Sequence, residues 1–189
     1  EYLARMGLGG EGHHAVVDVG FSGTIQRGLN ALLGGGIDGF YMATLANATA
    51  IEQQFGVRAL GAYYNAAPLD DVPLFIAKSF VAEKLLSADA TQLMRYAFDE
   101  HGAPVPEFRE LTEAEEAVFP LRSAIRSGAL QFVEEAIVAR DELLPDFRFP
   151  LDLAASLFEG FVAGMSPREA SVIQGVMLDD HYCGRGIVS

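Results

Sequence analysis

Residues 15–33 (AVVDVGFSGTIQRGLNALL) constrain the fold of this chain more than any other segment. A short continuous apolar run at residues 15–17 and 19 is typical of a strand covered on both faces. Gly20 and Gly23 permit a sharp turn and a close approach of the backbone to a ligand. The segment therefore predicts a strand, a tight polar turn and a helix.

The predicted helix has Ser22 as its cap and an apolar face. That face consists of Ile25, Leu29, Leu32 and Leu33. A helix that begins after a strand presents free N–H groups and the positive end of its dipole, which suits a phosphate or carboxylate. We therefore expect an anion site at this turn.

Asp18 ends the predicted strand, and ligands of open α/β sheets bind at the carboxyl ends of strands. We expect its carboxylate to be catalytic, as a general base, or to accept a hydrogen bond from a ligand hydroxyl or coordinate a metal. The alternative is that Asp18 accepts backbone N–H bonds within its own turn. A second catalytic candidate is Glu83, in an apolar helical stretch, where a carboxylate needs a partner; a salt bridge is the alternative.

The other candidate residues belong to the turn and the first turn of the helix, and they would bind the ligand. They are Gly20, Ser22, Gly23, Thr24 and Gln26. Plain helix capping explains the hydroxyls equally well, and a solvated helix face explains Gln26. Neither the histidines nor residues 179–183 have a second ligand cluster at a recognised spacing, so we predict no metal or cofactor.

The whole chain predicts an α/β fold, with a short parallel (Rossmann-like) sheet and a predominantly helical C-terminal half. The predicted strands are residues 15–20, 39–45 and 57–64, and the predicted helices are 22–33, 47–55, 72–88, 112–144 and 151–163, with one more after residue 166. We expect the fourth of these helices, 112–144, to break near Pro120 and Gly128, and residues 99–111 to form a loop or an extended excursion. Residues 176–189 read as irregular or as a short strand.

Two predicted parts follow from this pattern. Residues 1–65 form the α/β unit, and residues 66–189 form a mostly helical elaboration that packs on it, as one structural domain. Tyr2 to Arg5 read as the end of a helix already under way, so we expect a fragment of a longer protein.

The charge balance excludes several classes of partner. Thirteen Lys and Arg face 26 Asp and Glu, a formal net charge of −13. A nucleic-acid surface or a polybasic membrane patch needs clustered cations, so neither is expected. No apolar run is long enough for a membrane span, no signal peptide is visible, and Cys183 is the single cysteine. These features favour a cytoplasmic location.

Three phosphate-binding templates can be compared with the turn. The loop of nucleotide hydrolases requires a Gly-Lys-Ser/Thr sequence that this chain lacks, and Gly20-x-x-Gly23 breaks the dinucleotide spacing. A phosphoribosyltransferase-like loop is closer, because an acidic strand end runs into Gly23-Thr24. That family normally has two adjacent acidic residues, and Val19 occupies the second place here.

Residues 17–26 (VDVGFSGTIQ) resemble a recurring bacterial segment, Val-Asp-Ile-Gly-Trp-x-Gly-Ser/Thr-x-Gln, followed by a helix and a Gly-Tyr-Tyr strand. It occurs in proteins of surface-polysaccharide gene clusters described as haloacid-dehalogenase-like (HAD-like) hydrolases, often fused to or accompanying glycosyltransferases. Later elements are also similar. They are Gly39-Phe-Tyr41, the apolar helix that carries Glu83, residues 127–132, and Pro167 to Ala170 with Gly175 and Asp179-Asp180.

The resemblance implies the C-terminal region of such a protein, with upstream domains of the same protein as partners. Phe21 replaces the family's Trp, and Asp18-Val-Gly20 does not supply the Asp-x-Asp nucleophile motif, so hydrolase activity is not implied for this segment. The resemblance implies a region of a polysaccharide-biosynthesis protein that binds a sugar phosphate or nucleotide sugar. A non-catalytic structural or docking module and a phosphoribosyltransferase-like enzyme stay as alternatives.

Overall fold

The computed structural model describes residues 2–86, 91–148 and 150–175. The chain folds into two compact units. Unit 1 comprises Glu1–Ser79 with Pro150–Ala163, and unit 2 comprises Phe80–Phe149 with Gly164–Ser189.

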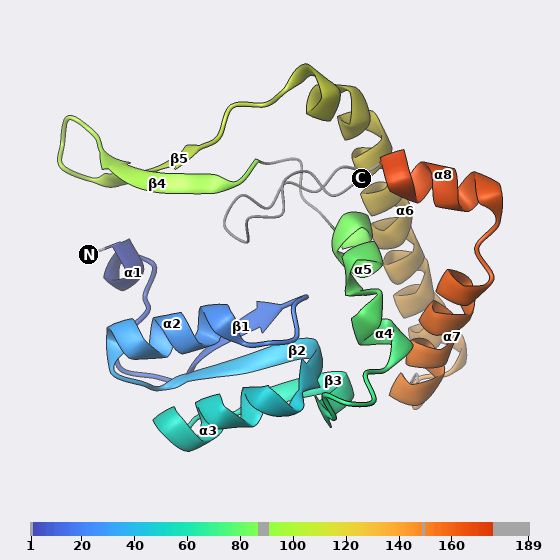
Figure 1. Ribbon diagram of the computed structural model, residues 1–189, viewed down its shortest axis with the longest axis horizontal. Coiled ribbons are helices and arrows are strands. Elements are labelled where there is room, and N and C mark those ends of the chain that lie inside the picture. Colours follow the sequence, from blue (N-terminus) through green and yellow to red (C-terminus); the bar gives the residue numbers. More distant parts are fainter. Residues whose placement is uncertain (1, 87–90, 149, 176–189) are drawn as a thin grey trace. The chain divides into compact units, whose positions relative to one another are not determined.

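Unit 1 is built on a three-stranded parallel sheet in the order β1-β2-β3 (Figure 1). Its elements are α1 (Tyr2–Arg5), β1 (His14–Asp18), α2 (Thr24–Leu33), β2 (Ile37–Leu45), the 3₁₀ turn η1 (Ala46–Ala48), α3 (Thr49–Phe55) and β3 (Ala59–Ala67). The predicted α/β class and parallel sheet are therefore confirmed. Gly34 ends α2 in the left-handed conformation and donates its N–H to Asn30 O, which is glycine C-cap chemistry.

Helix α2 buries polar side chains against the sheet, which corrects the predicted apolar face. Gln26 and Asn30, one turn apart, are both 0% exposed, whereas Ile25 is 63% and Leu32 75% exposed. Asn30 Nδ2 donates to Ile37 O at 2.9 Å, and Ile37 N donates to Asn30 Oδ1 at 2.9 Å. The polar face is buried because it hydrogen-bonds the backbone at the start of β2.

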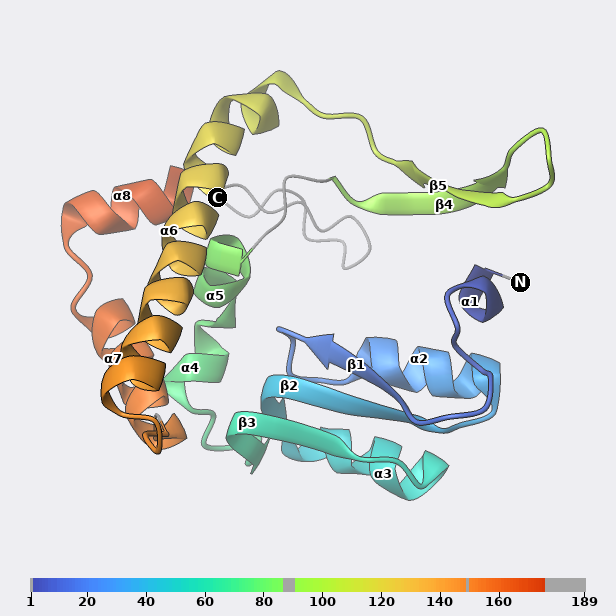
Figure 2. The ribbon, with the colours of Figure 1, turned by 180° about the vertical axis from the view of Figure 1, so that it is seen from behind.

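Within unit 1, the two crossover helices lie on the same face of the sheet. Both α2 and α3 lie in front of the strands in Figure 1 and behind them in Figure 2, and the two helices contact each other. On the other face Val17, which pairs with Phe40 across β1 and β2, is 87% exposed, and Phe40 is 40% exposed. The prediction that β1 is covered on both faces is therefore wrong, because right-handed crossovers in the order β1-β2-β3 place both helices on one side.

Two further helices, α4 (Leu74–Ala77) and α7 (Leu151–Ala163), pack on the end of the sheet. Phe75 is 3% exposed, and its ring lies 4.8 Å from that of Phe158 and 5.0 Å from that of Tyr63. This cluster extends unit 1 beyond the predicted boundary at residue 65 and draws in α7, whose bounds match the predicted helix 151–163.

Unit 2 contains α5 (Ser79–Leu86) from Phe80 onward, β4 (Leu93–Phe98), β5 (Pro104–Phe108), α6 (Glu113–Leu143) and α8 (Pro167–Gly175). Strands β4 and β5 pair antiparallel, so part of residues 99–111, predicted as a loop or an extended excursion, is extended and forms the second strand of a hairpin. The predicted helix 72–88 is divided at Lys78, whose φ of −118° and ψ of 23° depart from helical values.

Helix α6 continues through Pro120 and Gly128, which corrects the predicted breaks. A proline removes one backbone N–H, and the hydrogen bonds on either side sustain the helix. A capping box precedes α8, at the start of the helix predicted after residue 166: Ser166 N donates to Glu169 Oε2 at 2.8 Å, and Glu169 N donates to Ser166 Oγ at 3.3 Å. The pKa of Glu169 is held below its usual value by the bond that Ser166 Oγ donates to Glu169 Oε2 at 2.6 Å, and the bond from Ser166 N adds to the shift.

Within the described residues, none of the helices combines the length and the hydropathy that crossing a bilayer requires. The prediction for residues 176–189 lies outside the described part of the chain.

Candidate functional site

The loop that follows β1 lies at the carboxyl edge of the sheet in unit 1. Asp18 is the last residue of β1 and is half-buried. Its Oδ1 accepts the N–H of Gly20 at 2.8 Å. The carboxylate is therefore oriented by its own turn, as the alternative interpretation proposed, yet it is not enclosed, so it can still meet a ligand from solvent.

The N-terminus of α2 has no side-chain cap. Its cap residue is Gly23 (φ 69°, ψ 18°), and no side-chain cap hydrogen bond forms there. Ser22 therefore does not cap the helix as predicted; its Oγ lies 3.2 Å from Thr24 Oγ1, and both residues are exposed. The first-turn N–H groups, which no intrahelical carbonyl satisfies, thus lie beside two hydroxyls.

Gly23 is required at this turn for two reasons. Its positive φ favours glycine, and a Cβ there would overlap the side chain of Ile51. The turn is also tied to the sheet, because Leu45 N at the end of β2 donates to Phe21 O at 3.2 Å. The side chain of Phe21 packs against the buried cluster that contains Phe75. Phe21 thus serves as an anchor for the loop.

Tyr41 connects this loop to the interior. It is 3% exposed and pairs with Asp18 across β1 and β2. Burial raises the pKa of Tyr41 to about 12, and the charge of Asp18 contributes in the same direction. The phenol therefore stays neutral at physiological pH and donates its hydrogen bond to Gln26 Oε1 at 2.9 Å.

Gln26 does not face the loop surface. Its Nε2 donates to Ile37 O at 2.9 Å and to Arg58 O at 2.8 Å, while its Oε1 accepts the bond from Tyr41. All of these groups are internal, and a Cβ at Gly39 would overlap the Gln26 amide. The ligand-binding role predicted for Gln26 is therefore corrected to a structural one.

Glu83 does not belong to unit 1, which contains the loop after β1. It lies on α5 in unit 2, where it is half-buried and has an interaction partner. The residues that unit 1 does bring together are Asp18, Gly20, Ser22, Gly23 and Thr24.

Sequence reasoning missed a carboxylate elsewhere in unit 1. Glu159 on α7 accepts hydrogen bonds from Tyr64 Oη and from Phe75 N, each at 2.9 Å. Burial raises the pKa of Tyr64, and the bond to Glu159 adds to the shift. The signal was available, because Glu159 is the one charged residue between Leu153 and Ala163 and a carboxylate in such a helix needs partners.

A second missed feature is an irregular end of β3. Ala66 has a positive φ of 53°, uncommon for a residue other than glycine. Thr44 Oγ1 accepts the N–H of Ala66 at 2.8 Å, and Asn65 Oδ1 accepts that of Gly61 at 2.9 Å. These side chains complete the hydrogen bonds that the irregular register leaves open.

The fold and the loop define an α/β unit with an uncapped helix N-terminus and one carboxylate at the carboxyl edge of a parallel sheet. Comparison of the chain with protein-family models, with curated proteins and with solved structures finds no match. In the described residues no three His, Cys, Asp or Glu side chains are grouped as a metal site requires; residues 179–183 lie outside that part.

Proposed function

We propose that unit 1 binds a sugar phosphate or nucleotide sugar at the loop between β1 and α2, as a region of a HAD-like or glycosyltransferase-associated protein of polysaccharide biosynthesis. The observation that carries the proposal is the uncapped start of α2 at Gly23, next to the hydroxyls of Ser22 and Thr24. A phosphate there would accept hydrogen bonds from backbone N–H groups and hydroxyls and would gain from the helix dipole.

Asp18 supplies the second half of the recognition. With Oδ1 held by Gly20 N–H, its orientation is fixed, and the carboxylate can accept a hydrogen bond from a sugar hydroxyl or take its proton as a base. The family resemblance at residues 17–26 supports a ligand that contains a sugar. The lone cysteine and the sequence features described above support a cytoplasmic location.

The test is a thermal-shift titration of the full chain with UDP-glucose, GDP-mannose, glucose 1-phosphate and inorganic phosphate. A ligand at a hundredfold excess over its dissociation constant stabilises the folded state by about 2.7 kcal/mol. We expect Asp18→Asn to weaken binding of the sugar compounds but not of phosphate, and Ser22→Ala/Thr24→Ala to weaken both. Ser127→Ala, exposed on α6, is the control.

A non-catalytic docking module is the second candidate, and the bare face of the sheet favours it. Val17, on the edge strand β1, is 87% exposed on that face, as an interface residue would be in a free chain. If no compound of the panel shifts the melting temperature, the ligand proposal is wrong and the docking module is the better interpretation.

A further inference from the structure

The second half of α6 exposes an apolar surface in unit 2. Every residue from 127 to 148 is exposed, including large apolar ones. Phe132 is 70% exposed, Val133 50% and Ile137 44%. A surface helix of a free-standing domain normally turns such side chains inward, so this exposure marks an interaction surface.

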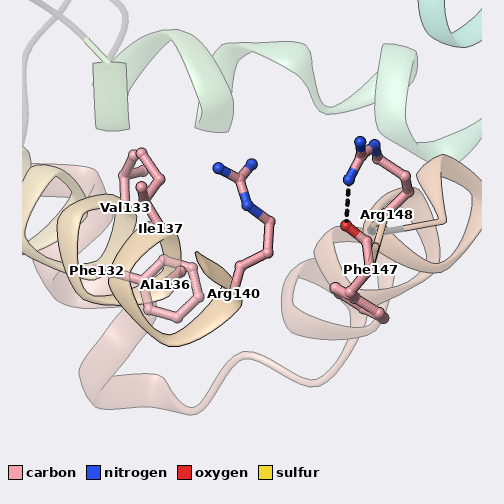
Figure 3. A pocket seen from close by; sticks show the side chains of 7 residues that line it. All are labelled: Phe132, Val133, Ala136, Ile137, Arg140, Phe147 and Arg148. Carbon is pink, nitrogen blue, oxygen red and sulfur yellow. Dashed lines mark hydrogen bonds between the residues drawn. The ribbon is translucent and has the colours of Figure 1, made fainter. Parts of the chain in front are cut away.

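These side chains line a groove that continues past the end of the helix. The α6 positions are Phe132, Val133, Ala136, Ile137 and Arg140, and the turn after the helix adds Phe147 and Arg148. Figure 3 shows Arg140 extending between the apolar side chains of α6 and the turn that carries Arg148. The α6 positions span residues 132–140, about 12 Å along the axis, which is the length of about two turns of a second helix.

Basic and acidic side chains lie in different hollows around α6. The charged residues of the groove are two arginines, although the chain has a net charge of −13. The acidic residues Glu134, Glu135 and Glu142 line a separate hollow of α6 instead. Apolar anchors flanked by cations complement an apolar ligand flanked by carboxylates.

Both arginines are available to a ligand. Arg148 Nη1 donates to Phe147 O at 3.0 Å, which positions its guanidinium and leaves other N–H groups. Arg140 pairs with its neighbour Asp141 at 2.7 Å, but both side chains are largely solvated (42% and 59% exposed), and exposed pairs of this kind contribute little.

We propose that this groove binds an amphipathic α-helix of a partner protein, with Asp or Glu residues flanking its apolar stripe. The leucine-sized anchors of that helix contact Phe132 and Ile137, and its carboxylates pair with Arg140 and Arg148. An anionic lipid surface is the poorer occupant, because the other side of α6 is acidic and the whole chain is repelled by such a surface.

The test uses two fluorescein-labelled helical peptides with the same leucine stripe, one flanked by Glu and one by Lys, titrated with the full chain at physiological salt. Net charge alone favours the Lys peptide, so tighter binding of the Glu peptide requires the groove. We expect the Glu peptide to bind about tenfold more tightly, and Arg140→Glu/Arg148→Glu to reverse the order. Glu135→Lys/Glu142→Lys, outside the groove, is the matched control that keeps the order.

Further variants separate the apolar and ionic contributions. Phe132→Ser should weaken the binding of both peptides. Asp141→Asn should tighten the binding of the Glu peptide a few-fold, because it releases Arg140 from its ion pair. Circular dichroism of each variant establishes that it is folded. Equal binding of both peptides, or tighter binding of the Lys peptide, would overturn the proposal.

Two other occupants would also overturn it. One is a second copy of the chain, detected by light scattering as a dimer that Phe132→Ser dissociates. The other is a membrane, detected as binding to phosphatidylcholine–phosphatidylserine vesicles that the same substitution abolishes.

Discussion

Helices α2 and α6 differ in which side chains they bury: α2 buries polar residues, whereas α6 exposes apolar ones. In unit 1, α2 buries Gln26 and Asn30 completely and exposes Leu32. In unit 2, the second half of α6 exposes Phe132 and Ile137. Whether a side chain is buried therefore depends on the groups that pack against it. Helix α2 lies against strand ends whose backbone groups need hydrogen bonds, whereas the apolar side of α6 is exposed to solvent.

The largest expected effect is at Asn30. Asn30→Leu keeps the size of the side chain but leaves the buried N–H of Ile37 without its acceptor, and it removes the bonds that the Asn30 amide donates to Ile37 O and Gln26 O. A buried unsatisfied group costs about 1–3 kcal/mol and a lost hydrogen bond about 0.5–1.5 kcal/mol, so we expect the free energy of unfolding to fall by about 2–4 kcal/mol in urea titrations.

Leu32→Asn on the same helix is the matched control for that substitution. Leu32 is 75% exposed, so a change within about 0.5 kcal/mol is expected. If Asn30→Leu were as mild as its control, the hydrogen bonds of the polar face would not stabilise unit 1.

A smaller, pH-dependent effect is expected at Asp38. Its carboxylate accepts hydrogen bonds from Arg58 N at 2.8 Å and Arg58 Nε at 2.9 Å, next to the Arg58 carbonyl that Gln26 binds. The side-chain bond from Arg58 lowers the pKa of Asp38 below its ordinary value of 3.8, and the backbone bond adds to it. Because the folded-state pKa is lowered, the stabilisation is complete above about pH 4 and is lost as pH falls through the lowered pKa.

The test is urea unfolding of Asp38→Asn across the pH range. At pH 7 we expect a loss of at most about 1 kcal/mol, since this pair is more exposed than the α2 bonds. The difference from the natural protein should shrink toward zero in acid; a difference independent of pH would show that the charge of Asp38 is not its cause.

The smallest effect is expected on α6. Ile137→Ser removes a side chain that is 44% exposed in the groove, so the unfolding free energy of the free chain should change by no more than about 0.5 kcal/mol. A loss above about 2 kcal/mol in a monomer would mean that the apolar face is covered within the chain, and the contrast with α2 would disappear.

Local chemistry made part of the fold predictable from sequence. The strand that ends at Asp18, the glycine stop at Gly34 and the capping box at Ser166 and Glu169 depend on neighbours within a few residues. The candidate site was predictable to the same extent: the turn and its hydroxyls were placed correctly. The cap was predicted wrongly. Ser22 was expected to cap α2, but the cap residue is Gly23, which takes the left-handed conformation and forms no side-chain cap hydrogen bond.

The misplaced residues depend on contacts distant in sequence. Gln26 was assigned to the loop because its spacing from Ser22 permits it, but its amide is bound by Arg58 O, 32 residues away. The hairpin of β4 and β5 was not predicted, because Pro104 and Pro106 are typical of a loop. An edge strand of a two-stranded sheet nevertheless tolerates both prolines.

The sequence by itself determined the α/β class, the parallel sheet, the bounds of the helix at residues 151–163 and the position of Asp18 at a strand end. These follow from periodicity, turn chemistry and capping, which act over a few residues. Only the tertiary structure decided that α2 turns its polar face inward and that Glu159 meets Tyr64, 95 residues away. The physical reason is that a buried polar group must find a partner wherever the chain supplies one, and that partner is fixed by packing rather than by local sequence.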